Sequence, residues 1–128
     1  MDAQTLDDLF SAFGPVRARR MFGGAGLYAD GLMFALEADG LLYLKADAVF
    51  AADLAARGAA PFTYVAKTGP RTMGSFWRVP DAALDDPEDL AALARRALEA
   101  AQTAAREKPP RAASARRQRP ARPIPTGT

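Results

Sequence analysis

The sequence predicts an α+β fold in which helices pack on one antiparallel sheet of five strands, in the order α-β-β-β-α-β-β-α. Apolar residues repeat at helical spacing near the N-terminus and again after residue 87. Between these segments, short runs of alternating apolar residues are separated by Asp-Gly and Gly-Pro steps. The connections between the first strands are too short for a parallel crossover, so these strands must run antiparallel. The chain has 128 residues, of which 49% are hydrophobic, and this is enough for one core.

The first helix is predicted from about Asp2 or Thr5 to Phe13. Thr5, followed three residues later by Asp8, imitates a capping box. Gly14-Pro15 then ends the helix. The apolar residues of this segment form one continuous stripe on a helix: Leu6, Leu9, Phe10 and Phe13.

Three strands are predicted to follow, beginning with a glycine-rich strand from about Arg19. Asp30-Gly31 and Asp39-Gly40 predict hairpin turns, because glycine tolerates the positive φ that such turns need. Between and beyond the turns, apolar residues alternate with polar or small ones. Glycines in this hairpin are expected to be structural, by letting the strand bend or another element approach closely: Gly23, Gly24, Gly26 and Gly31.

The second half of the chain predicts two further helices and two further strands. Asp47 is expected to cap a helix that stops at Gly58. PFTYVAK, from Pro61, predicts the fourth strand, Gly69-Pro70 a turn, and Thr72–Val79 the fifth strand. Asp86 is expected to cap the last helix, with Pro87 at its first position. Its buried stripe is predicted to contain Leu90, Leu93, Ala94, Ala97, Leu98 and Ala101, with Arg95 and Arg96 off that face.

Composition divides the chain into a folded domain, residues 1–105, and a basic tail, residues 106–128. The tail holds seven basic residues and one acidic residue, a net charge of +6, whereas the rest of the chain carries −4. Large apolar residues are almost absent from Lys108 onward, so the tail is expected to be disordered. We expect weak, non-specific nucleic-acid contact through its arginines: Arg111, Arg116, Arg117, Arg119 and Arg122. An alternative is that the tail only keeps the protein in solution.

Several classes of catalytic site are excluded by composition. The chain has no Cys and no His, so thiolate nucleophiles, Ser–His triads and His-ligated zinc sites are impossible. The carboxylate pairs Asp7-Asp8 and Asp85-Asp86 are predicted in or before the first turn of a helix, where capping accounts for them. Gly24-x-Gly26-x-x-Ala29 matches a relaxed dinucleotide fingerprint, but it leads into a turn and another strand instead of a helix. We therefore expect a protein that is not an enzyme and binds no metal and no cofactor.

The sequence also bears on location and on the exposed surface. The acidic start has no apolar segment after it, and no apolar run approaches the ~20 residues that span a bilayer, so we expect a cytoplasmic protein that does not contact membrane. Aromatic residues in the strands leave a base-stacking sheet as an alternative role. Most of them suit the core, and Tyr64 and Trp77 are expected to be the most exposed.

Four motifs together resemble the N-terminal domain of the TfoX/Sxy family of bacterial competence regulators. They are RMFGGAGLYADGLMFAL, the LYLKAD run from Leu42 to Asp47, the G-x-x-PFTY block from Gly58 to Tyr64, and FWRVP ending at Pro80. The resemblance covers roughly Thr5 to Ala105. It implies an α+β fold similar to the type III secretion chaperones and, because such domains often pair, a homodimer. It supplies no catalytic residue.

The resemblance implies transcription or competence regulation through a protein partner. In full-length competence regulators a helical C-terminal domain follows, and the whole protein is thought to assist a cyclic-AMP-responsive transcription activator. This chain has a basic tail where that domain would follow. Our preferred hypothesis is a small non-catalytic interaction module, with weak DNA affinity from the tail. The alternative is a stand-alone chaperone-like domain with no DNA role, which holds a peptide or protein; it predicts an exposed apolar patch or an open sheet edge.

Overall fold

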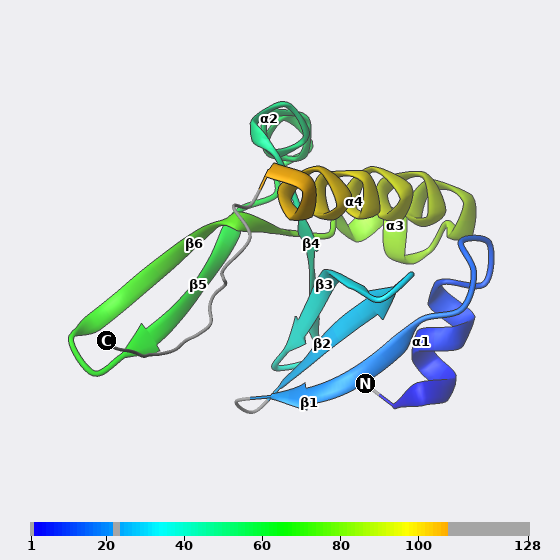
Figure 1. Ribbon diagram of the computed structural model, residues 1–128, viewed down its shortest axis with the longest axis horizontal. Helices are drawn as coiled ribbons and strands as arrows, with labels where there is room; N and C mark the ends of the chain where they lie inside the picture. Colours follow the sequence, from blue (N-terminus) through cyan, green and yellow to red (C-terminus); the bar gives the residue numbers. More distant parts are fainter. Residues whose placement is uncertain (1, 22–23, 108–128) are drawn as a thin grey trace, which may run out of the picture.

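The computed structural model describes residues 2–21 and 24–107, which form one antiparallel sheet of six strands with helices packed on it (Figure 1). The strand order is β1-β2-β3-β4-β6-β5, so β1 and β5 are the two edges. The strands are β1 (Arg17–Met21), β2 (Gly24–Ala29), β3 (Leu32–Ala38), β4 (Leu41–Lys45), β5 (Pro61–Ala66) and β6 (Gly69–Arg78). The helices are α1 (Ala3–Leu9), α2 (Ala48–Ala56), α3 (Asp81–Leu84) and α4 (Pro87–Glu107).

The predicted α+β class and antiparallel pairing are confirmed, but the predicted number of five strands is wrong. The stretch predicted as one glycine-rich strand forms two, β1 and β2, which pair antiparallel from Arg17↔Tyr28 to Met21↔Gly24. The chain therefore reverses between Met21 and Gly24. The sequence has a Gly-Gly step here, Gly23-Gly24, which is a turn signal, but we interpreted these glycines as a bend within one strand. The short helix α3 was not predicted either.

The two predicted Asp-Gly hairpin turns are confirmed. Asp30 and Gly31 have φ of 52° and 77°, and Asp39 and Gly40 have φ of 53° and 78°. Positive φ at both central residues defines the turns that fit the twist of a tight hairpin.

The connection between β5 and β6 corrects another prediction. The turn consists of Lys67 and Thr68, between the paired residues Ala66 and Gly69, whereas Gly69-Pro70 was predicted as the turn. Gly69 takes a φ of 118° at the start of β6, and Pro70 is paired with Val65. Gly69 is therefore the first residue of β6, where its positive φ is needed, and it is not one of the two turn residues.

The helix caps follow the predicted chemistry, except in α1. Asp47 Oδ1 accepts a hydrogen bond from Phe50 N at 2.8 Å, and Gly58 after α2 has a φ of 88°. Asp86 Oδ1 accepts from the amides of the residues two and three positions on in α4. In α1 the cap is Asp2, whose Oδ1 accepts from Thr5 N at 2.8 Å, and the helix ends at Leu9. The carboxylates of Asp7 and Asp8 therefore lie in the last turn of α1 and not in its first.

One hydrophobic core lies between the sheet and the helices. Phe34 is its aromatic centre, with ring centroids 5.6 Å from Phe10 and 5.1 Å from Phe13. The predicted stripe of α4 is buried apart from Leu98, which is half-buried, and Ala91 and Ala100 are buried with it. The fully buried large side chains of the core are Phe10, Leu27, Phe34, Leu42, Leu44, Phe50, Leu54, Val79 and Leu90.

The last helix and the described ranges bear on the predicted domain boundary, the tail and Gly23. Helix α4 continues to Glu107, two residues past the predicted end of the domain at 105. The tail arginines, residues 111–122, and Gly23 lie outside the described residues. Among the helices that the structure describes, none is long and apolar enough to cross a lipid bilayer.

Candidate functional site

The two faces of the sheet differ, because alternate residues of a strand point to opposite sides. Leu42 and Leu44 of β4 point into the core, so Tyr43 between them points the other way. Leu36 is paired with Tyr43 and therefore shares its side. We call this side, away from the core, the open face. Figure 1 shows the β5–β6 hairpin extending from the rest of the sheet as an arm.

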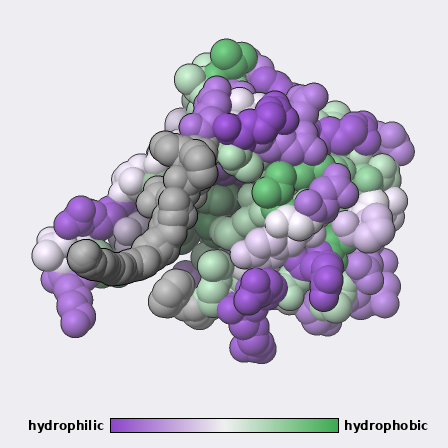
Figure 2. All heavy atoms as spheres, in the orientation of Figure 1, coloured by the Kyte–Doolittle hydropathy of each residue, from purple (hydrophilic) through white to green (hydrophobic). Residues whose placement is uncertain are grey.

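The open face contains an apolar hollow of about 580 Å³. It is bordered by both edges of the sheet, since β1 contributes Met21 and β5 contributes Tyr64 and Val65. In the orientation of Figure 1, Figure 2 shows hydrophobic residues in the middle of the molecule, between the arm and the rest of the sheet. The residues that line the apolar hollow are Met21, Gly24, Ala25, Met33, Leu36, Glu37, Ala38, Phe62, Tyr64, Val65 and Met73.

Two of the predicted structural glycines shape this face. A Cβ on Gly24 would collide with the carbonyl oxygen of Glu37, so β2 and β3 approach too closely there for any side chain. A Cβ on Gly26 would lie 3.1 Å from Met33 Sδ and 3.3 Å from Met21 Sδ. The absence of a side chain at Gly26 therefore leaves room for the ends of Met21 and Met33, which both line the hollow. Gly31 lies apart from the hollow, in the turn between β2 and β3.

Aromatic side chains form one wall of the open face. The ring centroids of Tyr43 and Phe62 are 4.7 Å apart in an edge-to-face arrangement, and those of Phe62 and Tyr64 are 5.9 Å apart and stacked. Tyr64 is exposed, as predicted. The expectation for Trp77 is wrong: its ring packs against the core, and its Nε1 donates a hydrogen bond to Gly74 O at 2.9 Å. Trp77 is paired with Leu44, which places it on the core side of the sheet.

Three basic side chains lie on the same face, outside the lining of the hollow. Arg19 is paired with Gly26, Arg71 with Tyr64, and Lys45 follows Tyr43 by two positions. Within residues 2–21 and 24–107, none of these three cations forms an ion pair. The Arg19 guanidinium lies 5.9 Å from the ring centroid of Tyr28, and Lys45 Nζ lies 5.3 Å from that of Phe76. One acidic residue, Glu37, is among the residues that line the hollow; it is paired with Leu42, which points to the other side, and its carboxylate accepts a hydrogen bond from Gly40 N at 2.8 Å.

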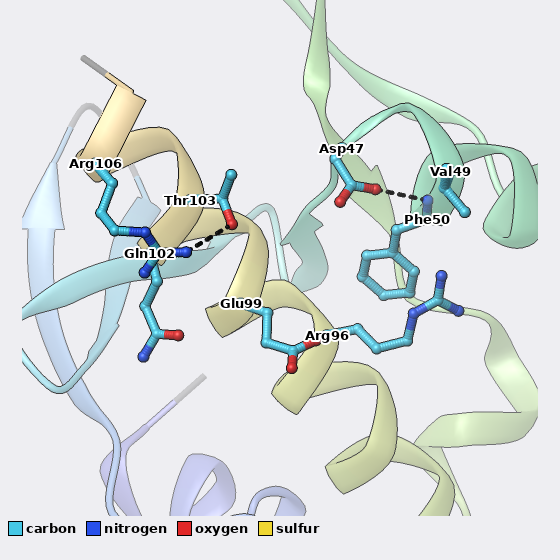
Figure 3. A pocket seen from close by; sticks show the side chains of 8 residues that line it. All are labelled: Asp47, Val49, Phe50, Arg96, Glu99, Gln102, Thr103 and Arg106. Carbon is cyan, nitrogen blue, oxygen red and sulfur yellow. Dashed lines mark hydrogen bonds between the residues drawn. The ribbon is translucent and has the colours of Figure 1, made fainter. Parts of the chain in front are cut away.

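A second, polar hollow of about 370 Å³ lies between the start of α2 and the last turns of α4 (Figure 3). Its two arginines contact neighbouring residues. Arg96 places its guanidinium 4.3 Å from the ring centroid of Phe50 and pairs with Asp53 at 2.8 Å. Arg106 donates to Thr103 Oγ1, one turn earlier in α4, at 3.3 Å. The contacts of Arg96 hold α2 against α4, so we interpret the polar hollow as a structural seam between two helices.

Two carboxylates, Asp2 and Asp89, have a pKa lowered by hydrogen bonds. Hydrogen bonds from the Arg57 side chain lower the pKa of Asp89 below its ordinary value, and the same pair raises the pKa of Arg57. The hydrogen bonds from Thr5 lower the pKa of Asp2, which caps α1. Both shifts belong to structural contacts outside the apolar hollow. Among the described residues, no group of three or more His, Cys, Asp or Glu side chains could hold a metal ion.

Sequence reasoning singled out Gly24 and Tyr64 but missed most of the residues that form the hollow. Met21, Met33 and Met73 come from three different strands, and no motif connects them. The usable signal was the alternation within β4, which assigns Tyr43 to the side away from the core. Alternation within β3 would place Leu36 on the core side with Phe34, but a bulge between β2 and β3 puts both Phe34 and Ala35 in the core and turns Leu36 to the open face. That side was not recognised as a candidate site because the extra hairpin β1–β2 was not predicted.

The fold and the hollow define a small α+β domain with a core on one side of an antiparallel sheet and an apolar concave surface on the other. The TfoX N-terminal domain matches residues 8–101, which are nearly all of the folded chain, and the protein belongs to this family. The family is associated with competence and transcription regulation and is not known to be catalytic. A comparison with curated proteins found no match to the chain.

Proposed function

We propose that this chain is a protein-interaction module of competence or transcription regulation, which holds an apolar segment with acidic flanks from a partner protein in its apolar hollow. The single observation that carries the proposal is the hollow itself, because 580 Å³ of largely apolar concave space is enough for several side chains. Family membership supports a partner from the transcription apparatus, such as a transcription activator.

The chemistry of the hollow suits a polypeptide. Met21, Met33 and Met73 supply flexible, polarizable side chains, which adapt to apolar groups of different shape. Leu36 and Phe62 add a firm apolar floor and wall. An apolar surface of this kind gains free energy by excluding water from an equally apolar ligand.

The charges around the hollow suit acidic flanks. Arg19, Lys45 and Arg71 lie on the open face without ion pairs in the described part of the chain, and Glu37 is the one acidic residue among those that line the hollow. Complementary charges at the rim guide association and select among partners. Aspartate or glutamate on either side of the apolar residues would meet these cations.

The same geometry argues against a base-stacking platform. Single-stranded nucleic acid needs ring faces that are free to receive bases. The rings of Phe62 and Tyr64 are stacked on each other, and Tyr43 packs edge-to-face against Phe62. The floor of the hollow consists of methionine and leucine, which offer bases no hydrogen-bond donor.

Binding of the full-length chain to an array of random 12-residue peptides tests the proposal. We expect the bound peptides to be enriched in apolar residues flanked by Asp or Glu. The double variant Met33→Lys, Met73→Lys should lose this binding, because it places two charges in the hollow. The matched control is Val49→Lys, which changes an apolar residue that is 69% exposed on α2, away from the hollow. Peptides bound equally well by the double variant, with its fold verified by circular dichroism, would refute the proposal.

We further propose that the basic tail adds weak, non-specific affinity for DNA. A variant of the full chain with glutamine at Arg111, Arg116, Arg117, Arg119 and Arg122 tests this at about 50 and about 200 mM salt. The unchanged chain should lose about 10²-fold in affinity between the two salt concentrations, since each phosphate contact releases a counterion. The variant should bind much more weakly at low salt. Equal DNA binding by the two chains would place any DNA contact outside the tail arginines.

A further inference from the structure

The edge strand β5 is unusually unprotected. It contains no charged residue, its only proline is its first residue, and Thr63, Tyr64 and Val65 are exposed, with Val65 86% exposed. The opposite edge, β1, carries three arginines. Natural sheets protect their edges with charges, proline or bulges, because the unpaired N–H and C=O groups of an edge strand can pair with a strand from another chain. Beyond the bulge at Pro61/Phe62, the edge β5 is therefore open from Phe62 to Ala66, whereas the edge β1 is guarded.

The register of the β5–β6 hairpin identifies the backbone groups that are free. Ala66 and Gly69 flank a two-residue turn, so they form a hydrogen-bonded pair, and so does every second pair beyond them. Tyr64 and Phe62 consequently direct their amide and carbonyl groups toward β6. Thr63 and Val65 direct theirs outward. In the described sheet no strand pairs with this outer side of β5.

The free edge borders the apolar hollow. Phe62, Tyr64 and Val65 belong both to β5 and to the lining of the hollow. A strand laid along β5 would therefore direct every second side chain toward the apolar surface of the open face. Six residues of β5 span about 20 Å, at roughly 3.3 Å per residue. Arg71, paired with Tyr64 on the next strand, lies within reach of an acidic end of such a strand.

We propose that the partner segment binds in extended form, as a seventh strand added to β5, with main-chain hydrogen bonds to Thr63 and Val65. This rests on the proposed function and specifies its mode of binding. Main-chain bonds supply affinity that depends little on sequence, and side chains that enter the hollow supply selectivity. The segment has apolar residues at alternate positions and an acidic residue at each end of that row.

The probe for the test is the peptide acetyl-ETVTLTVTE-amide, whose odd positions place three apolar side chains between two glutamates. Two further peptides carry N-methyl groups on the amides of either the odd or the even positions. Only one of these sets of amides can face β5 in an added strand. We expect one methylated peptide to lose about tenfold or more in affinity for the full-length chain and the other to bind like the parent, because only one set of hydrogen bonds is removed.

A pair of protein variants tests the edge itself. Val65→Pro removes the outward amide at a position that makes no bond to β6 and faces Pro70, so the hairpin tolerates it. Val49→Thr, at an exposed valine of α2 away from the apolar hollow, serves as the control. We expect peptide affinity to fall about tenfold or more in Val65→Pro and to stay within about twofold in Val49→Thr. The methylated peptides decide the question without any variant if Val65→Pro does not fold.

Other outcomes would contradict either the added strand alone or the proposed function as well. Binding that is lost in the Met33→Lys, Met73→Lys variant but insensitive to Val65→Pro and to both methylated peptides would refute the added strand and leave the hollow as the site. Binding that survives the double variant would refute the proposed function as well. Affinity weaker than about 1 mM for the parent peptide would refute both. A dimer of the chain alone that Val65→Pro dissociates in sedimentation would show that a second copy occupies the edge.

Discussion

The glycines of β2 give a stability prediction whose magnitudes follow from their surroundings. In Gly24→Ala the new Cβ meets the carbonyl oxygen of Glu37, and it also lies 3.2 Å from Glu37 C and 3.3 Å from Ala38 Cα. These are backbone atoms of β3, which can yield only if the pairing of β2 with β3 loosens. Overpacking of this kind costs about 1–3 kcal/mol. The collision with a backbone carbonyl places the cost at the upper end of that range, about 3 kcal/mol. Subtracting about 0.4–1 kcal/mol for the smaller entropy of the unfolded alanine chain leaves a net loss of about 2 kcal/mol in the free energy of unfolding.

Two other glycines of the same sheet complete a graded series. In Gly26→Ala the neighbours are the ends of methionine and tyrosine side chains, which can move, so we expect a loss below about 1 kcal/mol. Gly74→Ala is the matched control, because nothing lies within 4 Å of its Cβ and its φ is not positive. It should raise stability by about 0.4–1 kcal/mol, through the entropy of the unfolded chain alone.

Thermal and urea unfolding of the full-length variants measure the series. For a domain of this size, 2 kcal/mol corresponds to a fall in Tm of roughly 8–16 °C for Gly24→Ala. The order of stability should be Gly74→Ala above the unchanged chain, then Gly26→Ala, then Gly24→Ala. Equal Tm for Gly24→Ala and Gly74→Ala would refute the close approach of β2 and β3. Full stability of Gly26→Ala combined with lost peptide binding would instead assign Gly26 to the binding surface.

Three further predictions concern the core, a cap and an ion pair. Leu90→Ala, at a fully buried position of α4, should cost about 2–5 kcal/mol in urea unfolding, whereas the exposed Val49→Ala should stay within about 0.5 kcal/mol. Asp47→Ala removes the acceptor for the Phe50 amide and should cost about 1 kcal/mol by the same measurement. Asp89 has a lowered pKa because Arg57 donates to it at 2.7 Å, so the pair stabilises the fold above the ordinary pKa of 3.8 and this contribution disappears as pH falls through the lower folded value. Asp89→Asn should therefore cost up to about 1 kcal/mol at pH near 6 and almost nothing at pH near 2, and an unchanged difference across that range would contradict this assignment.

The helices and the Asp-Gly hairpins could be predicted because their signals are local. A cap needs one side chain within three residues of the amide that it accepts from, as Asp47 shows. A tight turn needs positive φ at fixed positions, which Asp30 and Gly31 supply. In both cases the residue recognised in the sequence is the one that caps the helix or adopts the turn conformation.

The other features depend on distant parts of the chain. Trp77 was expected on the surface, but its side is fixed by pairing with Leu44, more than thirty positions earlier. The hollow requires Met21 and Met73 to face the same space, and they belong to strands separated by most of the sheet. The turn was predicted two residues too late, at Gly69-Pro70, because the Gly-Pro step is a stronger turn signal than Lys67-Thr68. Sequence pattern assigns a residue to one side of its own strand, and tertiary pairing decides what lies opposite.

The attachment of the arm has a consequence for motion. β6 is paired with β5 along six positions but with β4 along only three, Tyr43↔Arg78, Leu44↔Trp77 and Lys45↔Phe76. The strands β1 to β4, by contrast, follow one another as hairpins of neighbouring segments. The β5–β6 hairpin is thus joined to the rest of the sheet by three paired positions of β6. Phe62, Tyr64 and Met73 lie beyond these positions and line the apolar hollow, so a displacement of this part of the hairpin would change the width of the hollow.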